Sequence, residues 1–246
     1  MIEKAVCRYP AMRVKKQLIA VVIIFAVMIL TGVSFLAGRR DELRDTAKYI
    51  TCIINKEEAV DSPKKIALTF DDGPHPYYTQ QLLDGLKERG AKASFFVMGK
   101  QAEAYPELVL RMHEEGHLVG NHTYSHIQLS KNNRETFKAE LIQTNELLSG
   151  ITGEEPQYVR PPYGSWDKSF ETELTMIPVL WTIDPMDWCS SDVNGIVKKV
   201  TQKAEENAVI LMHDEYKSSV TAALEIVDIL QKQGYEFVTV DEILFD

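Results

Sequence analysis

The stretch "HEEGHLVGNHTYSH", residues 113–126, carries two histidine pairs with the same spacing on either side of a short apolar run. The first pair, His113 and His117, spells H-E-x-x-H, a zinc-peptidase signature that needs one continuous helix so that both imidazoles share a face. Gly116 interrupts that helix, and a glycine inside a helix costs about 1 kcal/mol relative to alanine. The letters "HLVG" are typical of a strand. We therefore predict that a helix ends near His113 and a strand begins near His117, which argues against a peptidase site.

The second pair, His122 and His126, follows the same predicted strand at its carboxyl end, the end that carries active sites in βα barrels. A single helical turn here would point both imidazoles the same way, but two histidines make only half a metal site. The best source of a third ligand is "TFDDGPH", residues 69–75, where Asp71 and Asp72 are adjacent. One carboxylate can bind a cation while its neighbour stands beside it. One Asp and two His with an open fourth position are typical of a catalytic zinc site.

Short apolar runs alternate with longer helical ones from Lys64 onward. Strands are predicted at 65–70, 92–98, 117–120, 158–160, 178–183, 208–212 and 236–240. Helices are predicted at 78–89, 106–115, 133–148 and 218–233, with a proline at the start of the second and glycines after three of them. This alternation indicates an α/β fold with a mostly parallel sheet, closed into a barrel. About 183 residues is short for an eight-stranded barrel.

The amino-terminal part has a different character. Residues 18–38 contain no charge over 21 residues, enough for about 31 Å of helix, which predicts a transmembrane anchor. A cleaved signal peptide has a shorter apolar run and a better cleavage site than "SFLAG", so secretion after cleavage is the alternative. Residues 1–17 are then a cytoplasmic tail, 39–63 a stem and 64–246 an extracellular domain. Five Lys and Arg flank each side; long domains translocate largely regardless of charge, which favours a cytoplasmic amino terminus.

Charge limits the partners of the domain. Removing the 8 basic and 4 acidic residues of 1–45 from totals of 27 and 36 leaves 19 basic and 32 acidic residues, or −13. So acidic a domain is a poor nucleic-acid binder, because phosphate neutralisation drives that affinity. Cys7 precedes the predicted anchor, and Cys52 and Cys189 follow it. The sequence leaves open whether the latter two form a disulfide.

Polar residues also follow the later predicted strands. Arg160 opens "RPPYG", Asp184 and Asp187 stand in "DPMDW", and His213 stands in "ILMHD". Each alone has an ordinary alternative as a surface arginine, a capping aspartate or a core histidine. Because all four follow strands of one predicted barrel, we expect them to converge at its carboxyl end.

Five motifs, "TFDDGP", "HTYSH", "RPPYG", "DPMDW" and "LMHD", occur in this order over roughly 64–244. Together they resemble the motifs of the NodB-type polysaccharide deacetylases, carbohydrate esterase family 4. The resemblance implies a distorted (β/α)7 barrel, in line with the seven strands predicted above. It also implies removal of N-acetyl or O-acetyl groups from sugar polymers with a divalent metal, commonly zinc.

Carried onto this sequence, the resemblance implies a role for each motif. The metal ligands would be Asp72, His122 and His126. Asp71 would be the general base and His213 the general acid.

Further residues would support these groups. Arg160 would pair with Asp71, and Asp184 with His213, while Asp187 would only cap a turn. The backbone N–H of Tyr163 would face the oxyanion. The walls of the acetyl pocket would be Trp188 and Leu211.

The resulting hypothesis is a membrane-anchored deacetylase of peptidoglycan N-acetylglucosamine, using Zn²⁺, with Co²⁺ or Ni²⁺ also compatible with the ligand set. Chitin oligomers, N-acetylmuramic acid and O-acetylated xylan are the alternative substrates. A glycosidase would need two carboxylates at least about 5 Å apart across the sugar, which Asp71 and Asp72 do not suggest. A non-catalytic binding module would not need both Asp71 and His213. Neither a nucleic acid nor an obligate protein partner is expected.

Overall fold

The computed structural model describes Ile23, Lys48 and residues 63–244. The chain divides into residues 1–62 and a compact unit of residues 63–246. The predicted tail and nearly all of the predicted anchor and stem lie outside the described residues. No helix within the described part of the chain is long and apolar enough to span a bilayer. The anchor thus stays a prediction.

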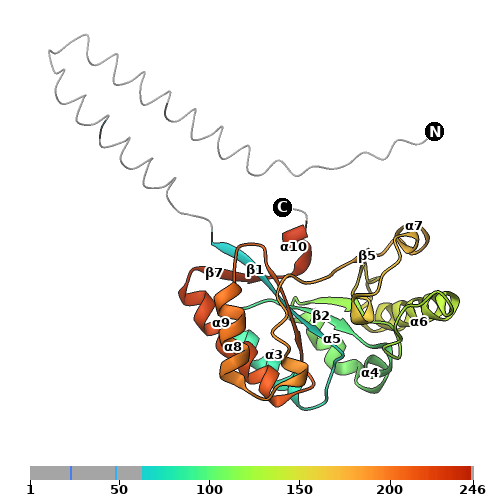
Figure 1. The fold of residues 1–246 in the computed structure, drawn as a ribbon, viewed down its shortest axis with the longest axis horizontal. Coiled ribbons are helices and arrows are strands. Elements are labelled where there is room, and N and C mark those ends of the chain that lie inside the picture. Colours follow the sequence, from blue (N-terminus) through green and yellow to red (C-terminus); the bar gives the residue numbers. More distant parts are fainter. Residues whose placement is uncertain (1–22, 24–47, 49–62, 245–246) are drawn as a thin grey trace, which may run out of the picture. The chain divides into compact units, whose positions relative to one another are not determined.

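Seven parallel strands form one sheet at the centre of the compact unit (Figure 1). They are β1 (Lys64–Asp71), β2 (Ser94–Val97), β3 (Leu118–Asn121), β4 (Tyr158–Val159), β5 (Ile177–Pro178), β6 (Val209–His213) and β7 (Tyr235–Val238). The strand order is β5-β4-β3-β2-β1-β6, and β7 pairs with the first half of β1. Six of the seven predicted strands are confirmed, with β4 reduced to two residues, whereas of the predicted strand 178–183 only Pro178 lies in β5.

The two ends of this strand order meet. Beyond β5 the chain turns towards β6, where Ile183 forms a bridge with Ile210. The Leu211 N–H donates to the Ile183 carbonyl at 2.9 Å, and the Thr182 N–H donates to the Val209 carbonyl at 2.9 Å. The sheet is therefore curved, as a distorted barrel of the expected type requires.

The four predicted helices are present as α3 (Tyr78–Glu88), α5 (Pro106–Glu114), α6 (Arg134–Thr152) and α9 (Lys217–Lys232). The described residues also form helices that were not predicted: α4 (Gly99–Ala104), α7 (Ser169–Leu174), α8 (Val193–Lys203), α10 (Val240–Leu244) and the 3₁₀ turns η1 (Pro162–Gly164) and η2 (Asp187–Cys189). The signal for α8 was present: Asp192 caps it by accepting the Gly195 N–H at 3.1 Å, and Ile196 and Val200 form its buried stripe.

The junction between α5 and β3 is as predicted. The helix ends at Glu114, Gly116 adopts a left-handed φ of 76°, and β3 starts at Leu118. A left-handed residue just past a helix end favours glycine, which has no Cβ to clash. His113 and His117 therefore do not share a helix.

Alternating side chains of β1 separate two layers of core. Ile66, Leu68 and Phe70 pack in the large cluster shared with the surrounding helices. Ala67 belongs instead to the inner cluster of the barrel, which also contains Phe96. Because the side-chain period of a strand is two, Thr69 and Asp71 share the inner face with Ala67.

Candidate metal centre and active site

The carboxyl ends of four strands supply the polar groups predicted from the sequence. Asp71 ends β1 and is the register partner of His213, which ends β6. His122 directly follows β3, and Arg160 directly follows β4. Parallel pairing thus brings residues that are far apart in the sequence to one edge of the sheet.

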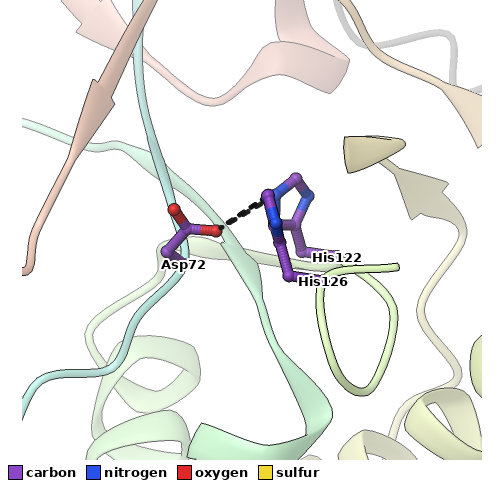
Figure 2. A group of neighbouring side chains, drawn as sticks. All are labelled: Asp72, His122 and His126. Atoms are coloured by element: carbon purple, nitrogen blue, oxygen red, sulfur yellow. Dashed lines mark ion pairs between the residues drawn. The ribbon is translucent and has the colours of Figure 1, made fainter. Parts of the chain in front are cut away.

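Asp72 faces the two predicted histidine ligands across this edge (Figure 2). Its Oδ1 lies 3.3 Å from His122 Nε2 and 3.4 Å from His126 Nε2. One ligand atom from each of the three residues lies within 4.8 Å of the other two. The structure therefore brings together the three residues predicted to bind a metal.

The backbone reaches this arrangement without the helical turn that we expected after β3. Instead, Thr123 and His126 both adopt a left-handed φ of 62°, and Asp72 adopts one of 72°. The Asn121 side chain stabilises the turn, because its Oδ1 accepts the Thr123 N–H at 2.7 Å. Such a bond is typical of Asn at a chain reversal. Left-handed residues other than glycine cost about 1–2 kcal/mol each, so this geometry has to be held by its surroundings.

The donor set fits a cation. His122 Nδ1–H donates to the Arg160 carbonyl oxygen at 2.6 Å, so in the neutral ring, the form that binds metals, Nε2 carries the lone pair and faces Asp72. Asp72 Oδ1 is buried and has no hydrogen-bond partner. Burial alone would lower the pKa of His122, but the charges of Asp71 and Asp72 raise it. Lone pairs that converge on one point attract positive charge, and a divalent ion satisfies them together.

Asp71 is held by a fully buried arginine. Arg160 Nη1 donates to Asp71 Oδ1 at 2.8 Å and to Thr69 Oγ1 at 2.6 Å, while its Nε donates to the Val179 carbonyl at 3.1 Å. The guanidinium lies 4.2 Å from the centre of the Phe96 ring. The predicted contact between Arg160 and Asp71 is present, and it extends across the interior of the barrel.

The partner of His213 was predicted wrongly. Asp187, not Asp184, accepts from His213: its Oδ1 lies 2.9 Å from Nδ1, and its Oδ2 accepts the backbone N–H at 2.9 Å. Asp184 instead accepts the N–H of Met186 at 2.7 Å. Met186 has a left-handed φ of 62°, and this turn places Asp187 in the interior. Two aspartates three residues apart gave the sequence analysis no basis for this choice.

The contact changes the basicity of His213. Burial alone would lower the pKa of the imidazole, but the hydrogen bond and charge of Asp187, together with Asp71 and Asp72, raise it to about 9. His213 Nε2 lies 3.9 Å from Asp72 Oδ2. A protonated imidazole is therefore held at the edge of the metal centre at neutral pH.

The remaining predicted residues lie on segments around this centre. Tyr163, in η1, has a left-handed φ of 59°, the residue is 66% exposed, and the centre of its ring lies 4.8 Å from that of His126. Trp188, in η2, is 50% exposed, whereas Leu211 in β6 is buried. The thiol of Cys189 is free and exposed, and Cys52 lies outside the described residues. The substrate contacts of Tyr163, Trp188 and Leu211 stay predictions.

Comparisons with known proteins agree with the motifs. A family model described as polysaccharide deacetylase matches residues 58–178. A peptidoglycan-N-acetylglucosamine deacetylase of Bacillus cereus is 38% identical over 213 residues, which cover 83% of this chain and 97% of that protein. The chain belongs to the polysaccharide deacetylase family.

Other members of the polysaccharide deacetylase family are longer. The peptidoglycan-N-acetylmuramic acid deacetylase PdaC of Bacillus subtilis is 41% identical over 197 residues, which are 80% of this chain but 42% of that protein. A solved structure of peptidoglycan deacetylase PdaC superimposes with a TM-score of 0.72 at 41% identity, covering 74% of this chain and 90% of that chain. The shared fold is thus the α/β domain, and this chain spans less than half of the full-length PdaC.

Proposed function

We propose that this chain is a metal-dependent deacetylase that hydrolyses the N-acetyl groups of peptidoglycan N-acetylglucosamine. The observation that carries the proposal is the convergence of a cation site, a buried carboxylate and a protonated imidazole at one edge of the sheet. Hydrolysis of an acetamide needs an activated water, a stabilised oxyanion and a proton for the departing amine. The names of the relatives point to the same class of substrate.

Asp72, His122 and His126 would hold the divalent ion, with Zn²⁺ as the proposed metal and Co²⁺ or Ni²⁺ as substitutes. When bound, such an ion polarises the acetyl carbonyl and lowers the pKa of its water towards about 7. The Arg160 carbonyl keeps His122 in the tautomer that this binding requires.

Asp71 is the proposed general base. Arg160 occupies its Oδ1, while its Oδ2 lies 3.8 Å from His122 Nε2 and so faces the metal centre. That oxygen is placed to take a proton from the attacking water. General base catalysis of this kind contributes about 10²–10⁴-fold.

His213 is the proposed general acid. It carries a proton at neutral pH because its pKa is raised to about 9, and Asp187 holds it through Nδ1. Its Nε2–H therefore points the transferable proton towards the centre. Protonation of the glucosamine nitrogen lets it leave as a neutral amine.

The segments around the centre would bind the acetyl group and the glycan. The backbone N–H of Tyr163 would stabilise the oxyanion, where one donor is worth about 3–4 kcal/mol. Trp188 and Leu211 would enclose the acetyl methyl group. A groove of about 500 Å³ next to η1, lined in part by Ser130, Arg134 and Ser165, offers polar side chains to neighbouring sugar units.

The proposed location is the outer face of the cell membrane, with residues 18–38 as a single-pass anchor and 64–246 as the catalytic domain. A domain tethered by a short stem reaches only nearby polymer, which favours the glycan strands of the wall. The relative PdaC is named for N-acetylmuramic acid, which makes that sugar the competing substrate.

The test uses the purified full chain in detergent, loaded with Zn²⁺, and muropeptides that retain both acetylated sugars. Mass spectrometry follows acetyl loss, and fragmentation assigns it to one sugar. We expect loss from N-acetylglucosamine that stops when the metal is chelated. Loss from N-acetylmuramic acid alone would replace the proposed substrate, and a metal-loaded protein that releases no acetate would contradict the proposed activity.

A further inference from the structure

Asp214 is a buried acidic residue for which the proposed mechanism has no use. It directly follows His213 and is completely buried. The Thr79 hydroxyl donates to its Oδ2, while its Oδ1 is buried without a hydrogen-bond partner. A buried carboxyl group is costly, and burial raises the pKa of Asp214 to about 7. Such a group calls for a structural or functional reason.

The carboxyl group of Asp214 packs directly on the backbone of the residue that follows Asp72. A Cβ added at Gly73 would lie 2.6 Å from Asp214 Cγ and closer still to both carboxyl oxygens. The φ of Gly73 is not among the left-handed ones, so contact with Asp214 explains the glycine better than backbone conformation does. The carboxyl end of β6 thus limits where the turn after β1 can lie.

Thr79 extends this contact to the other end of the turn. Its hydroxyl oxygen accepts the His75 N–H at 2.7 Å, and its own N–H donates to the His75 carbonyl at 3.2 Å. His75 Nδ1 in turn accepts the backbone N–H groups of Tyr77 and Tyr78 at 3.2 Å each. Asp214 therefore contacts the start of the turn between Asp72 and His75, and Thr79 is hydrogen-bonded to its end.

We propose that Asp214 and Thr79 are positioning residues that hold Asp72 in its metal-binding conformation. Asp72 has an unfavourable left-handed φ of 72°, so its turn relaxes unless neighbouring groups hold it. A ligand has to stay within about 0.5 Å of its productive position. Because Asp214 follows the proposed acid on the same strand end, β6 also sets the distance between acid and ligand. The inference rests on the proposed metal centre.

The test compares the full chain with Thr79→Val, which removes the hydroxyl, and Thr79→Ser, which keeps it. Zn²⁺ affinity is measured by competition with a chromophoric chelator. Hydrogen exchange of the peptide covering residues 72–79 is measured without metal. We expect Thr79→Val to weaken Zn²⁺ binding about tenfold, the low end for lost outer-shell partners, and to speed exchange in that peptide. Thr79→Ser should match the wild-type chain in both Zn²⁺ affinity and hydrogen exchange.

Two further variants separate positioning from general stability. Gly73→Ala forces the turn and Asp214 apart and should also weaken Zn²⁺ binding about tenfold. Ser94→Ala is the matched control: it removes a fully buried hydroxyl that accepts the Val240 N–H at 3.0 Å, at the start of β2. It should lower the unfolding temperature without changing Zn²⁺ affinity.

Three results would overturn the inference. The first is a Zn²⁺ affinity of Thr79→Val and Gly73→Ala that stays within about twofold of the wild-type affinity. The second is a loss of Zn²⁺ affinity in Ser94→Ala as large as the loss in Thr79→Val and Gly73→Ala. A wild-type chain that binds no Zn²⁺ would instead remove the proposed metal centre itself, and the inference with it.

Discussion

The two ends of β3 carry histidine pairs with identical spacing and very different surroundings. At the amino end, His117 is 6% exposed, its Nδ1 accepts the Ala93 N–H at 3.1 Å, and its ring lies edge-on to Phe95. Burial there lowers the pKa of His117 to about 4. At the carboxyl end, His122 faces Asp72, and its pKa is raised despite complete burial. The residue opposite the imidazole, and not the spacing, distinguishes a metal centre from a packed core histidine.

At the amino edge, burial and the nearby charge of Lys92 lower the pKa of His117, whereas the carboxylates of the carboxyl edge come from β1. This strand begins with Lys64 and Lys65 and ends with Asp71, followed by Asp72. In a parallel sheet all carboxyl ends lie at the same edge, so the two aspartates meet the histidines that follow β3. The following predictions test that contrast between the two edges of the sheet, from the largest expected effect to the smallest.

Asp71→Asn should lower the rate of acetate release by about 10²–10⁴-fold, the usual contribution of a general base. The amide keeps nearly the same shape and leaves Asp72, His122 and His126 in place, so Zn²⁺ should still bind. Acetate release and metal content are measured on the same preparation. Normal turnover would refute the assignment of the base. Loss of the metal together with activity would show that Asp71 belongs to the ligand set.

Substitutions at the two ends of β3 test the comparison directly. Loss of outer partners alone costs about 10–100-fold in metal affinity, so His122→Ala should cost more than about 100-fold. His117→Asn should leave Zn²⁺ affinity unchanged, since the Asn oxygen can still accept the Ala93 N–H. Chelator competition measures both variants. Equal loss in the two would mean that the metal site extends to the amino end, against the geometry.

The corrected partner of His213 yields a paired test. Asp187→Asn removes the charge that raises the pKa of His213, so the alkaline loss of activity should begin at lower pH. Because the protonated imidazole is the proposed active form, a pKa lowered by one unit from about 9 should reduce the rate at pH 8 by about twofold, and a pKa lowered by two units should reduce it by about tenfold. Asp184→Asn keeps an acceptor for the Met186 N–H and should leave the profile in place. A shift in Asp184→Asn alone would restore the original assignment.

The smallest effect concerns stability and comes from His117. Its folded pKa of about 4 lies below the unfolded value near 6.5, so the unfolded chain binds more protons between these values. Stability is fully present above pH 6.5 and is lost as the pH falls towards 4. At pH 5 the loss is about 2 kcal/mol. Urea unfolding at pH 7 and pH 5 should show a smaller difference for His117→Asn, and an unchanged difference would mean that other groups titrate.

Much of the fold was readable because its signals are local. Gly116 separates helix from strand, and the apolar runs and their periodicity mark six of the seven strands and four of the helices. The convergence of Asp71, Asp72 and Arg160 followed from their places after strands, and the pairing of Arg160 with Asp71 followed from the family resemblance.

Two of the misses involve contacts between segments far apart in the sequence. The run 178–183 reads as one strand, but Ile177–Pro178 pair with β4 whereas Ile183 bridges β6. No local pattern records that change of neighbour. The choice between Asp184 and Asp187 depends in the same way on the left-handed turn at Met186, which the alternation of residues does not encode.

The buried position of Arg160 bears on how this domain can diverge. Its guanidinium joins Asp71 to Thr69 and to the chain beyond β5, over the ring of Phe96, so the proposed base is built into the hydrophobic interior. Tyr163 and Trp188, in contrast, stand exposed on short turns. Substitutions in these turns would therefore change the proposed glycan contacts without disturbing the proposed base, which the core holds in place. A substitution that repacks the core beneath Phe96 would instead displace Arg160 and, with it, the proposed base.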